Sequence, residues 1–233
     1  MGKRVILIRH GENPPDDRVF THLTAAGFEP DLYRPFAGEA LPSADETIAG
    51  SVVYGGPFEA YAYEKYPFLR DEAHWIETCM RQAIPLLGIC QGAQQIAHVL
   101  GAPVGPPADE AAEFGYYRIE PTEAGRSFLP EPIHVAQSHF HTFGIPPGAI
   151  HLARSALFPN QAFSYGATTF AVQFHAEVTI EGFRRWQENP SHRYDRKGAQ
   201  NREEQDALMH LHDAGQGRWF HRLLDGLFGQ PTE

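Results

Sequence analysis

The sequence predicts a three-layer α/β/α fold, in which helices cover both faces of a central, mainly parallel β-sheet. Short, unbroken apolar runs alternate with stretches of helical spacing through the first hundred residues, which is the pattern of repeated strand–helix–strand units. Hydrophobic residues make up 42% of the 233 positions, which is enough for one substantial core. Because no repeat or linker interrupts the chain, we expect a single domain over residues 1–233, with a core of about residues 4–180 and a C-terminal helical extension from about residue 181.

The first hundred residues carry the clearest elements. Unbroken apolar runs predict buried strands at residues 5–8 and 85–90. Residues 28–35 and 50–57 are also expected to form strands, the second of which ends in a tight glycine turn. Apolar residues at helical spacing predict the helices between and after these strands, at residues 18–27, 68–83 and 92–100. Gly101 is placed to close the last of these helices, because glycine readily adopts the left-handed conformation that follows a helix.

The later part of the sequence changes character. It contains many prolines and four short β-like pieces, which we expect to form strands and hairpins of the same sheet: residues 116–120, 133–137, 150–155 and 169–174. From residue 179 onward the chain is helical and charged, apart from a polar segment at residues 187–204 that we expect to be a loop or a loosely packed helix. The apolar face of a final helix is formed by Phe220, Leu223, Leu224 and Leu227.

The composition argues against several classes of function. The formal net charge of −10 offers little attraction to a polyanion, so we expect no nucleic-acid partner. No apolar run approaches the roughly 18 residues of a membrane span, so we expect no membrane association. The two cysteines, Cys79 and Cys90, cannot build a disulfide framework, and they indicate a reduced, cytoplasmic protein.

Cys90 lies where a predicted buried strand ends and a helix begins. Gly88 and Gly92, two residues before and two after it, permit the sharp turn that exposes a nucleophile. The amino terminus of the helix places unpaired N–H groups beside the sulfur, which favours the thiolate. A free cysteine is more commonly a core residue, and Cys79, in the middle of a predicted helix, fits that description. We therefore infer that Cys90 is the nucleophile.

A cysteine nucleophile needs a base and a group that orients the base. His175 and Glu177 stand two residues apart at the end of a predicted strand, so their side chains point to the same side of an extended chain. Glu177 can therefore orient the imidazole of His175, directly or through a neighbour. A histidine and a glutamate at this spacing are a weak signal alone, but they become a strong one together with the turn around Cys90.

Three motifs together carry a resemblance to a known family. Gly55-Gly56-Pro57, the run from Gly88 to Gln94 and the run from Gln173 to Glu177 resemble the three signatures of class I glutamine amidotransferases. The resemblance covers residues 5–177 and is closest to the stand-alone group that is similar to the amidotransferase domain of GMP synthase and includes γ-glutamyl peptidases. Residues 159–163 also match that group. The resemblance implies a flavodoxin-like class I amidotransferase fold.

The resemblance also implies a reaction and a set of roles. The chain is expected to hydrolyse glutamine or a γ-glutamyl amide through a thioester on Cys90, with no cofactor and no metal. His175 would be the base and Glu177 its orienting group, while the backbone N–H groups of Gly56 and Gln91 would form the oxyanion hole. The substrate pocket would be lined by Gln94, Ser138, His139 and His141. The implied partners are a small-molecule γ-glutamyl substrate and, if ammonia is passed on, a synthetase subunit.

The chain departs from the family pattern at three places. Ala176 stands where a proline is common, and Gln91 replaces the usual Leu or Phe without changing the backbone N–H it supplies. The third departure is His141, where an aspartate is usual that could pair with the α-ammonium group of the substrate. We therefore expect that free glutamine is not the best substrate, unless the loop backbone alone binds glutamine and His141 faces solvent.

Two alternatives from other classes stay open. One is a catalytically silent binding relative, against which the intact Cys90, His175 and Glu177 speak. The other is a histidine phosphatase, because Arg9-His10-Gly11 matches the short signature of that family, although a polar loop at the end of a strand accounts for the same residues. In an open α/β sheet, this loop lies at the carboxyl edge, so His10 can border the site in either case.

Overall fold

The computed structural model of the chain describes residues 3–189 and 194–229. The strands in chain order are β1 (Arg4–Ile8), β2 (Glu29–Tyr33), β3 (Ile48–Val53), β4 (Leu86–Ile89), β5 (Val104–Gly105), β6 (Glu113–Pro121), β7 (Ile133–His139), β8 (Thr142–Phe143), β9 (Ile150–Ser155), β10 (Ala162–Tyr165) and β11 (Thr169–Val172). The helices are α1 (Arg18–Ala25), the short 3-10 helix η1 (Pro35–Ala37), α2 (Phe68–Arg81), α3 (Gln91–Val99), α4 (Ile180–Glu188) and α5 (Arg202–Phe228).

The main sheet has the order β2-β1-β3-β4-β11-β10-β9-β6-β7. Its first five strands pair in parallel, and its last four pair antiparallel as hairpins and returns of the chain. The predicted α/β class and the parallel first half are confirmed, and residues 102–174 do supply the later strands of the same sheet. The carboxyl ends of β1, β3, β4 and β11 meet at one edge, which is where ligands bind in open α/β sheets.

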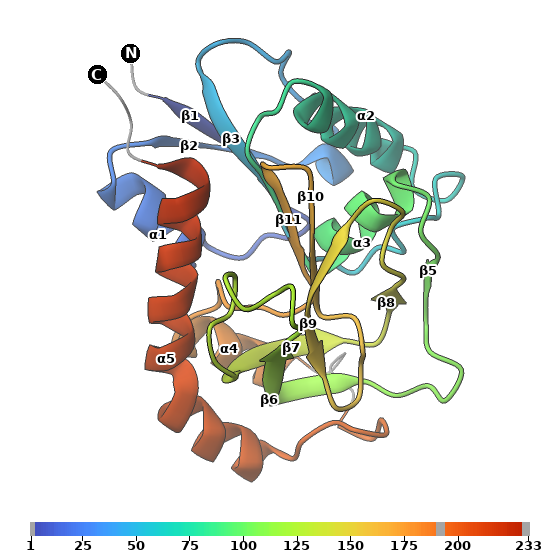
Figure 1. Cartoon of the computed structure of the whole chain (residues 1–233), viewed down its shortest axis with the longest axis vertical. Coiled ribbons are helices and arrows are strands. Elements are labelled where there is room, and N and C mark those ends of the chain that lie inside the picture. Colours follow the sequence, from blue (N-terminus) through green and yellow to red (C-terminus); the bar gives the residue numbers. More distant parts are fainter. Residues whose placement is uncertain (1–2, 190–193, 230–233) are drawn as a thin grey trace.

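Helices cover both faces of the parallel half, which confirms the three layers (Figure 1). On one face, the apolar sides of α1 and α5 pack on the sheet, with Val19, Trp219 and Phe220 among the buried residues. On the other face, α2 and α3 pack on the sheet through residues such as Trp75 and Ile96. The unbroken apolar strand runs in the sequence follow from this arrangement, because alternate residues of each strand are buried on opposite faces.

The C-terminal region is more closely joined to the core than the sequence suggested. Helix α5 is 27 residues long, begins with a capping box formed by Asn201 and Glu204, and contributes Trp219, Phe220 and Leu224 to the main hydrophobic cluster. The boundary expected near residue 181 therefore does not separate core from extension. Of the polar segment predicted at residues 187–204, positions 190–193 lie outside the described residues, while residues 187–188 end α4 and residues 202–204 begin α5.

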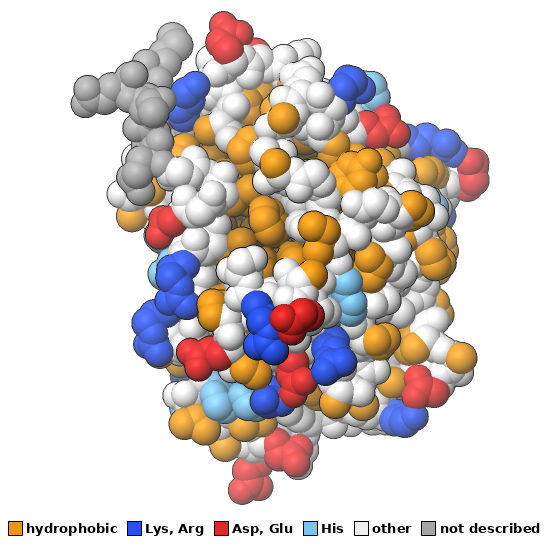
Figure 2. Space-filling view, in the orientation of Figure 1, with side chains coloured by type: hydrophobic (Ala, Val, Ile, Leu, Met, Phe, Trp, Pro, Cys, Tyr) orange, Lys and Arg blue, Asp and Glu red, His pale blue; other side chains and the backbone are white. Residues whose placement is uncertain are grey.

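The surface agrees with the charge balance of the sequence. On the face shown in Figure 2, Lys and Arg side chains are intermingled with Asp and Glu rather than gathered into one basic patch. Among the described helices, none combines the length and hydropathy that a bilayer crossing requires.

Candidate active site

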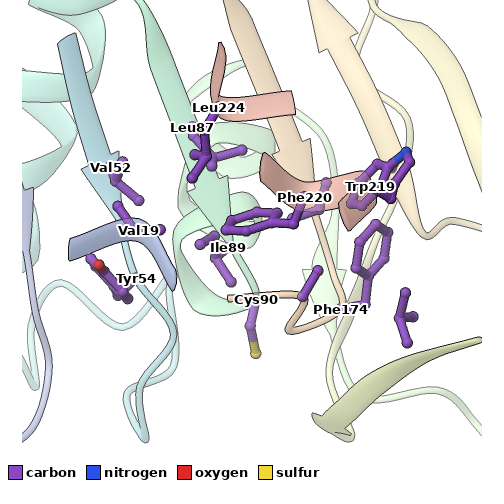
Figure 3. Close-up of a cluster of buried hydrophobic side chains, with 14 of the residues drawn as sticks. Val19, Val52, Tyr54, Leu87, Ile89, Cys90, Phe174, Trp219, Phe220 and Leu224 are labelled. Atoms are coloured by element: carbon purple, nitrogen blue, oxygen red, sulfur yellow. The ribbon is translucent and has the colours of Figure 1, made fainter. Parts of the chain in front are cut away.

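Cys90 occupies a strained turn between β4 and α3. Its φ of 51° and ψ of −107° lie outside the conformations that L-residues commonly adopt, and it is the N-cap residue of α3. The flanking glycines make the turn possible: a β-carbon at Gly88 would lie 2.8 Å from the backbone nitrogen of Ala93, and one at Gly92 would lie 2.0 Å from the carbonyl oxygen of Val53. Figure 3 shows the sulfur directed away from the hydrophobic cluster, which lies above it in this view.

The second cysteine has a different environment. Cys79 lies in α2, is fully buried among apolar residues, and has its thiol pKa raised to about 12 because burial opposes the thiolate. A thiol of this kind is protonated at neutral pH and unreactive.

His175 stands beside Cys90 and is oriented by Glu177. Its Nδ1 lies 2.7 Å from Oε1 of Glu177, and a β-carbon at Gly55 would lie within 3.3 Å of both the His175 ring and the Cys90 side chain. Burial opposes the imidazolium, but the charges of Glu177 and of the Cys90 thiolate outweigh burial and raise the pKa of His175 to about 10. The pKa of His175 is higher in the folded chain than the ordinary value of 6.5, so protonation of His175 stabilises the fold. This stabilisation is fully present below about pH 6.5 and is lost as the pH rises through about 10.

The turn that carries His175 and Glu177 is held by Arg18, a residue that no motif in the sequence marks. The guanidinium of Arg18 donates to the carbonyl oxygens of Ala176 and Val178, and its backbone N–H donates to the carbonyl of Glu177 at 2.8 Å. Arg18 in turn pairs with Asp213 of α5 at 2.7 Å. The C-terminal helix therefore supports the turn that carries His175 and Glu177.

The Gly55-Gly56 turn after β3 faces Cys90 from the other side. Gly56 has no space for a side chain, because a β-carbon there would lie 2.3 Å from the Cβ of His10 and 2.7 Å from Oε1 of Gln91. The Gln91 side chain, which replaces the apolar residue usual in the family, accepts a hydrogen bond from the backbone N–H of Phe58 at 2.9 Å. Within the described residues, the backbone N–H groups of Gly56 and Gln91 donate to no protein acceptor.

A cavity of about 440 Å³ opens beside Cys90, His175 and Glu177. Charged residues line it in pairs, among them Arg9 with Asp17 at 3.0 Å and Arg185 with Asp16 at 2.7 Å. Aromatic rings line it as well, since Trp186 packs edge-on against the His175 ring and Arg196 lies 4.2 Å above the Phe140 ring. The volume falls in the usual range for small-molecule sites.

The predicted pocket residues are only partly brought to this cavity. Ser138 and His139 line it, and the carbonyl oxygen of Ser138 lies 4.0 Å from the Cys90 sulfur. Gln94 is buried instead, where its amide donates to Oε1 of Gln173. The His141 ring stacks on Tyr61 with 6.0 Å between ring centroids, and His141 is not among the residues that line this cavity.

A buried polar network lies behind His139, and sequence reasoning missed it. Glu113 accepts hydrogen bonds from His139, from Ser155 at 2.6 Å and from Gln161 at 2.7 Å. Gln161 belongs to the segment that resembles the GMP synthase group, which was the only signal in the sequence. The network fixes β6, β7 and β9 at the edge of the cavity.

The phosphatase alternative does not fit the position of His10. The His10 side chain is fully buried, and both of its ring nitrogens are hydrogen-bonded to protein groups. No ring nitrogen is therefore free to accept a phosphoryl group, and the Arg9-His10-Gly11 match to phosphatases is accidental.

Comparisons with known proteins agree with the geometry. The family described as glutamine amidotransferase class-I matches residues 19–186. A glutamine amidotransferase-like protein, YfeJ, from Salmonella typhimurium is 33% identical over 66% of this chain and 67% of its own length. A GMP synthase from Aeropyrum pernix is 37% identical over 60% of this chain but only 26% of its own length. The crystal structure of a glutamine amidotransferase from Thermotoga maritima has a TM-score of 0.86 and 30% identity, covering 98% of this chain and 99% of that one. The chain therefore belongs to the class I glutamine amidotransferase family.

Proposed function

We propose that the chain hydrolyses glutamine or a larger γ-glutamyl amide through a covalent thioester. The observation that carries the proposal is the placement of Cys90, on a strained turn at a helix amino terminus, beside an imidazole that is hydrogen-bonded to Glu177. This arrangement supplies a nucleophile, a proton carrier and an orienting carboxylate within one buried site.

In the first half of the reaction, the Cys90 thiolate attacks the γ-carbonyl carbon and forms a tetrahedral intermediate. The backbone N–H groups of Gly56 and Gln91 are free to stabilise its oxyanion. Protonated His175, favoured by its raised pKa, then donates its proton to the leaving nitrogen. The C–N bond breaks, ammonia or an amine departs, and a γ-glutamyl thioester remains on Cys90.

In the second half, His175 is neutral and removes a proton from a water molecule that attacks the thioester carbon. The C–S bond breaks, glutamate is released, and Cys90 and His175 return to the thiolate and imidazolium forms. Glu177 keeps Nδ1 of His175 protonated and oriented throughout, so that the other ring nitrogen faces the reacting groups.

The cavity supports a substrate with anionic groups. Arg196, stacked on Phe140, offers a cation to a carboxylate, and the volume of about 440 Å³ accommodates more than a single amino acid. Two uses of the released ammonia fit this chemistry: discharge to solvent, or transfer to a synthetase partner of the kind that the likeness to GMP synthase suggests.

The proposal is tested by substituting the two cysteines in parallel. Cys90→Ser should abolish the release of ammonia or amine from glutamine and from γ-glutamyl amides, whereas Cys79→Ser, in the interior of α2, should keep most of it. Iodoacetamide labelling with mass mapping should modify Cys90 far faster than Cys79. A wild-type chain that hydrolyses no γ-glutamyl compound, or equal loss in both folded variants, would support a silent binding relative instead.

A further inference from the structure

His10 and Glu72 form a buried pair next to the Gly55-Gly56 turn, at the edge of the cavity that His10 helps to line. Nε2 of His10 lies 2.9 Å from Oε2 of Glu72, and both side chains are fully buried. Gln95 of α3 donates to the same Oε2 atom at 2.7 Å. The carboxylate is thus fixed by α2 and α3, and it fixes the ring of His10 in turn.

The other ring nitrogen of His10 is directed at the turn itself. Nδ1 lies 3.1 Å from the carbonyl oxygen of Tyr54 and 3.3 Å from that of Gly55. Both partners are acceptors, so Nδ1 must carry the hydrogen. Because Nε2 is held by Glu72, the ring cannot rotate away, and His10 is a fixed donor to two successive carbonyl groups.

The carbonyl group of Gly55 determines where the N–H of Gly56 points. The peptide unit is planar, so fixing the carbonyl of Gly55 also fixes the direction of the N–H of Gly56 on the opposite side of the same peptide. His10 packs against Gly56 from behind, while Oε1 of Gln91 holds the N–H of Phe58 further along the turn. Hydrogen bonds therefore hold the turn on both sides of Gly56, from His10 to the carbonyl groups before it and from the N–H of Phe58 to Gln91 after it.

We propose that His10, held by Glu72, is a positioning residue that aims the Gly56 N–H at the oxyanion of the tetrahedral intermediate. The inference rests on the proposed hydrolysis and deepens it, because it assigns a role to a motif that the triad leaves unused. The role requires only the Nδ1 donor of His10; the contact with Glu72 serves to hold that donor in place.

Two amide substitutions separate the two ring nitrogens. The amide nitrogen of Asn in His10→Asn falls near the position of Nδ1 and can donate to the Tyr54 and Gly55 carbonyls, but it does not reach Glu72. In His10→Gln, the longer side chain reaches Glu72 but not these carbonyls. Each variant removes one buried contact and keeps the other, so each serves as the stability control for the other.

We expect His10→Gln to lower kcat about 10- to 100-fold with little change in KM, because an oxyanion donor acts on the transition state rather than on bound substrate. His10→Asn should retain most of kcat. Hydrogen–deuterium exchange should be faster over residues 54–58 in His10→Gln than in His10→Asn, and the rate of Cys90 alkylation by iodoacetamide should be the same in both.

The exchange measurement keeps this inference separate from the proposed function. If exchange is faster in His10→Gln alone but the wild type hydrolyses no γ-glutamyl amide, the contacts of His10 with the turn are supported and the proposed hydrolysis is refuted. Equal exchange in the two variants, equal losses of kcat, or a loss of kcat matched by a loss of Cys90 alkylation would overturn the positioning role of His10.

Discussion

Two of the imidazole–carboxylate pairs at the cavity, His175 with Glu177 and His139 with Glu113, differ in what the second ring nitrogen faces. In the pair of His175 and Glu177, Nδ1 is bound at 2.7 Å and the rest of the ring faces Cys90. In the pair of His139 and Glu113, Nε2 is bound at 2.9 Å and Nδ1 lies 2.9 Å from the carbonyl oxygen of His141. The residue types and distances are nearly the same, but only His175 has a nitrogen available for chemistry.

The difference shows that a histidine beside a carboxylate is not by itself a general base. A base must exchange a proton with a reacting group, so one ring nitrogen has to be free of the protein. Where both nitrogens are occupied, as in His139, the pair instead joins strands, here through the Glu113 carboxylate that also binds Ser155 and Gln161. Three predictions follow from this difference.

The largest effect is expected on removing His175, the proposed base. His175→Ala should lower kcat/KM for a γ-glutamyl amide by about 10³-fold or more, because loss of the base disables both the departure of the amine and the attack of water. Steady-state kinetics on the variant, with circular dichroism as the check on folding, measures this effect. Retention of more than a tenth of the wild-type rate would show that another group carries the proton.

A smaller effect is expected when each glutamate becomes an amide. Glu177→Gln should lower kcat about 10²-fold, less than His175→Ala, because an orienting group contributes less than the base it orients. Glu113→Gln should lower kcat less than Glu177→Gln does, and it should reduce the free energy of unfolding by about 1–3 kcal/mol, because one of its three donors loses an acceptor. Kinetics and urea denaturation of both variants test this, and the reverse order of the two kcat values would break the comparison.

The smallest effect is expected at His141. Its ring stacks on Tyr61 outside the cavity, while its backbone carbonyl accepts the hydrogen bond from His139. Aspartate at position 141 would keep the backbone carbonyl that binds His139, so His141→Asp should change kcat/KM for free glutamine by less than about threefold. A new charge-assisted hydrogen bond to the substrate would change kcat/KM by about tenfold or more. A tenfold or larger gain on glutamine would show instead that the side chain reaches the substrate, as the family pattern suggested.

The fold class and the family motifs could be predicted from the sequence, because both depend on local patterns of residues. Unbroken apolar runs mark strands that are buried on two faces, and Gly88 and Gly92 mark a turn in which a β-carbon would clash with the backbone. Strand β10 and the short strands β5 and β8 were not predicted, since pieces of two to four residues carry too little periodicity.

The supporting residues of the site could not be predicted, because their partners are distant in the chain. Arg18 meets Asp213 in space, and His10 meets Glu72, through the packing of whole helices on the sheet. No spacing rule relates such positions. The match of His10 to a phosphatase signature also shows how a short motif misleads when the burial of its side chain is unknown.

The contacts of Arg18 with the turn that carries His175 bear on the order in which the chain is made. Synthesis delivers Cys90 and His175 well before Asp213, yet Arg18 is fully braced only once α5 has docked and Gly217 has made room for its guanidinium. The turn that carries His175 is thus tied through Arg18 to a helix that is synthesised after it, so the geometry of this turn depends on a later segment of the chain.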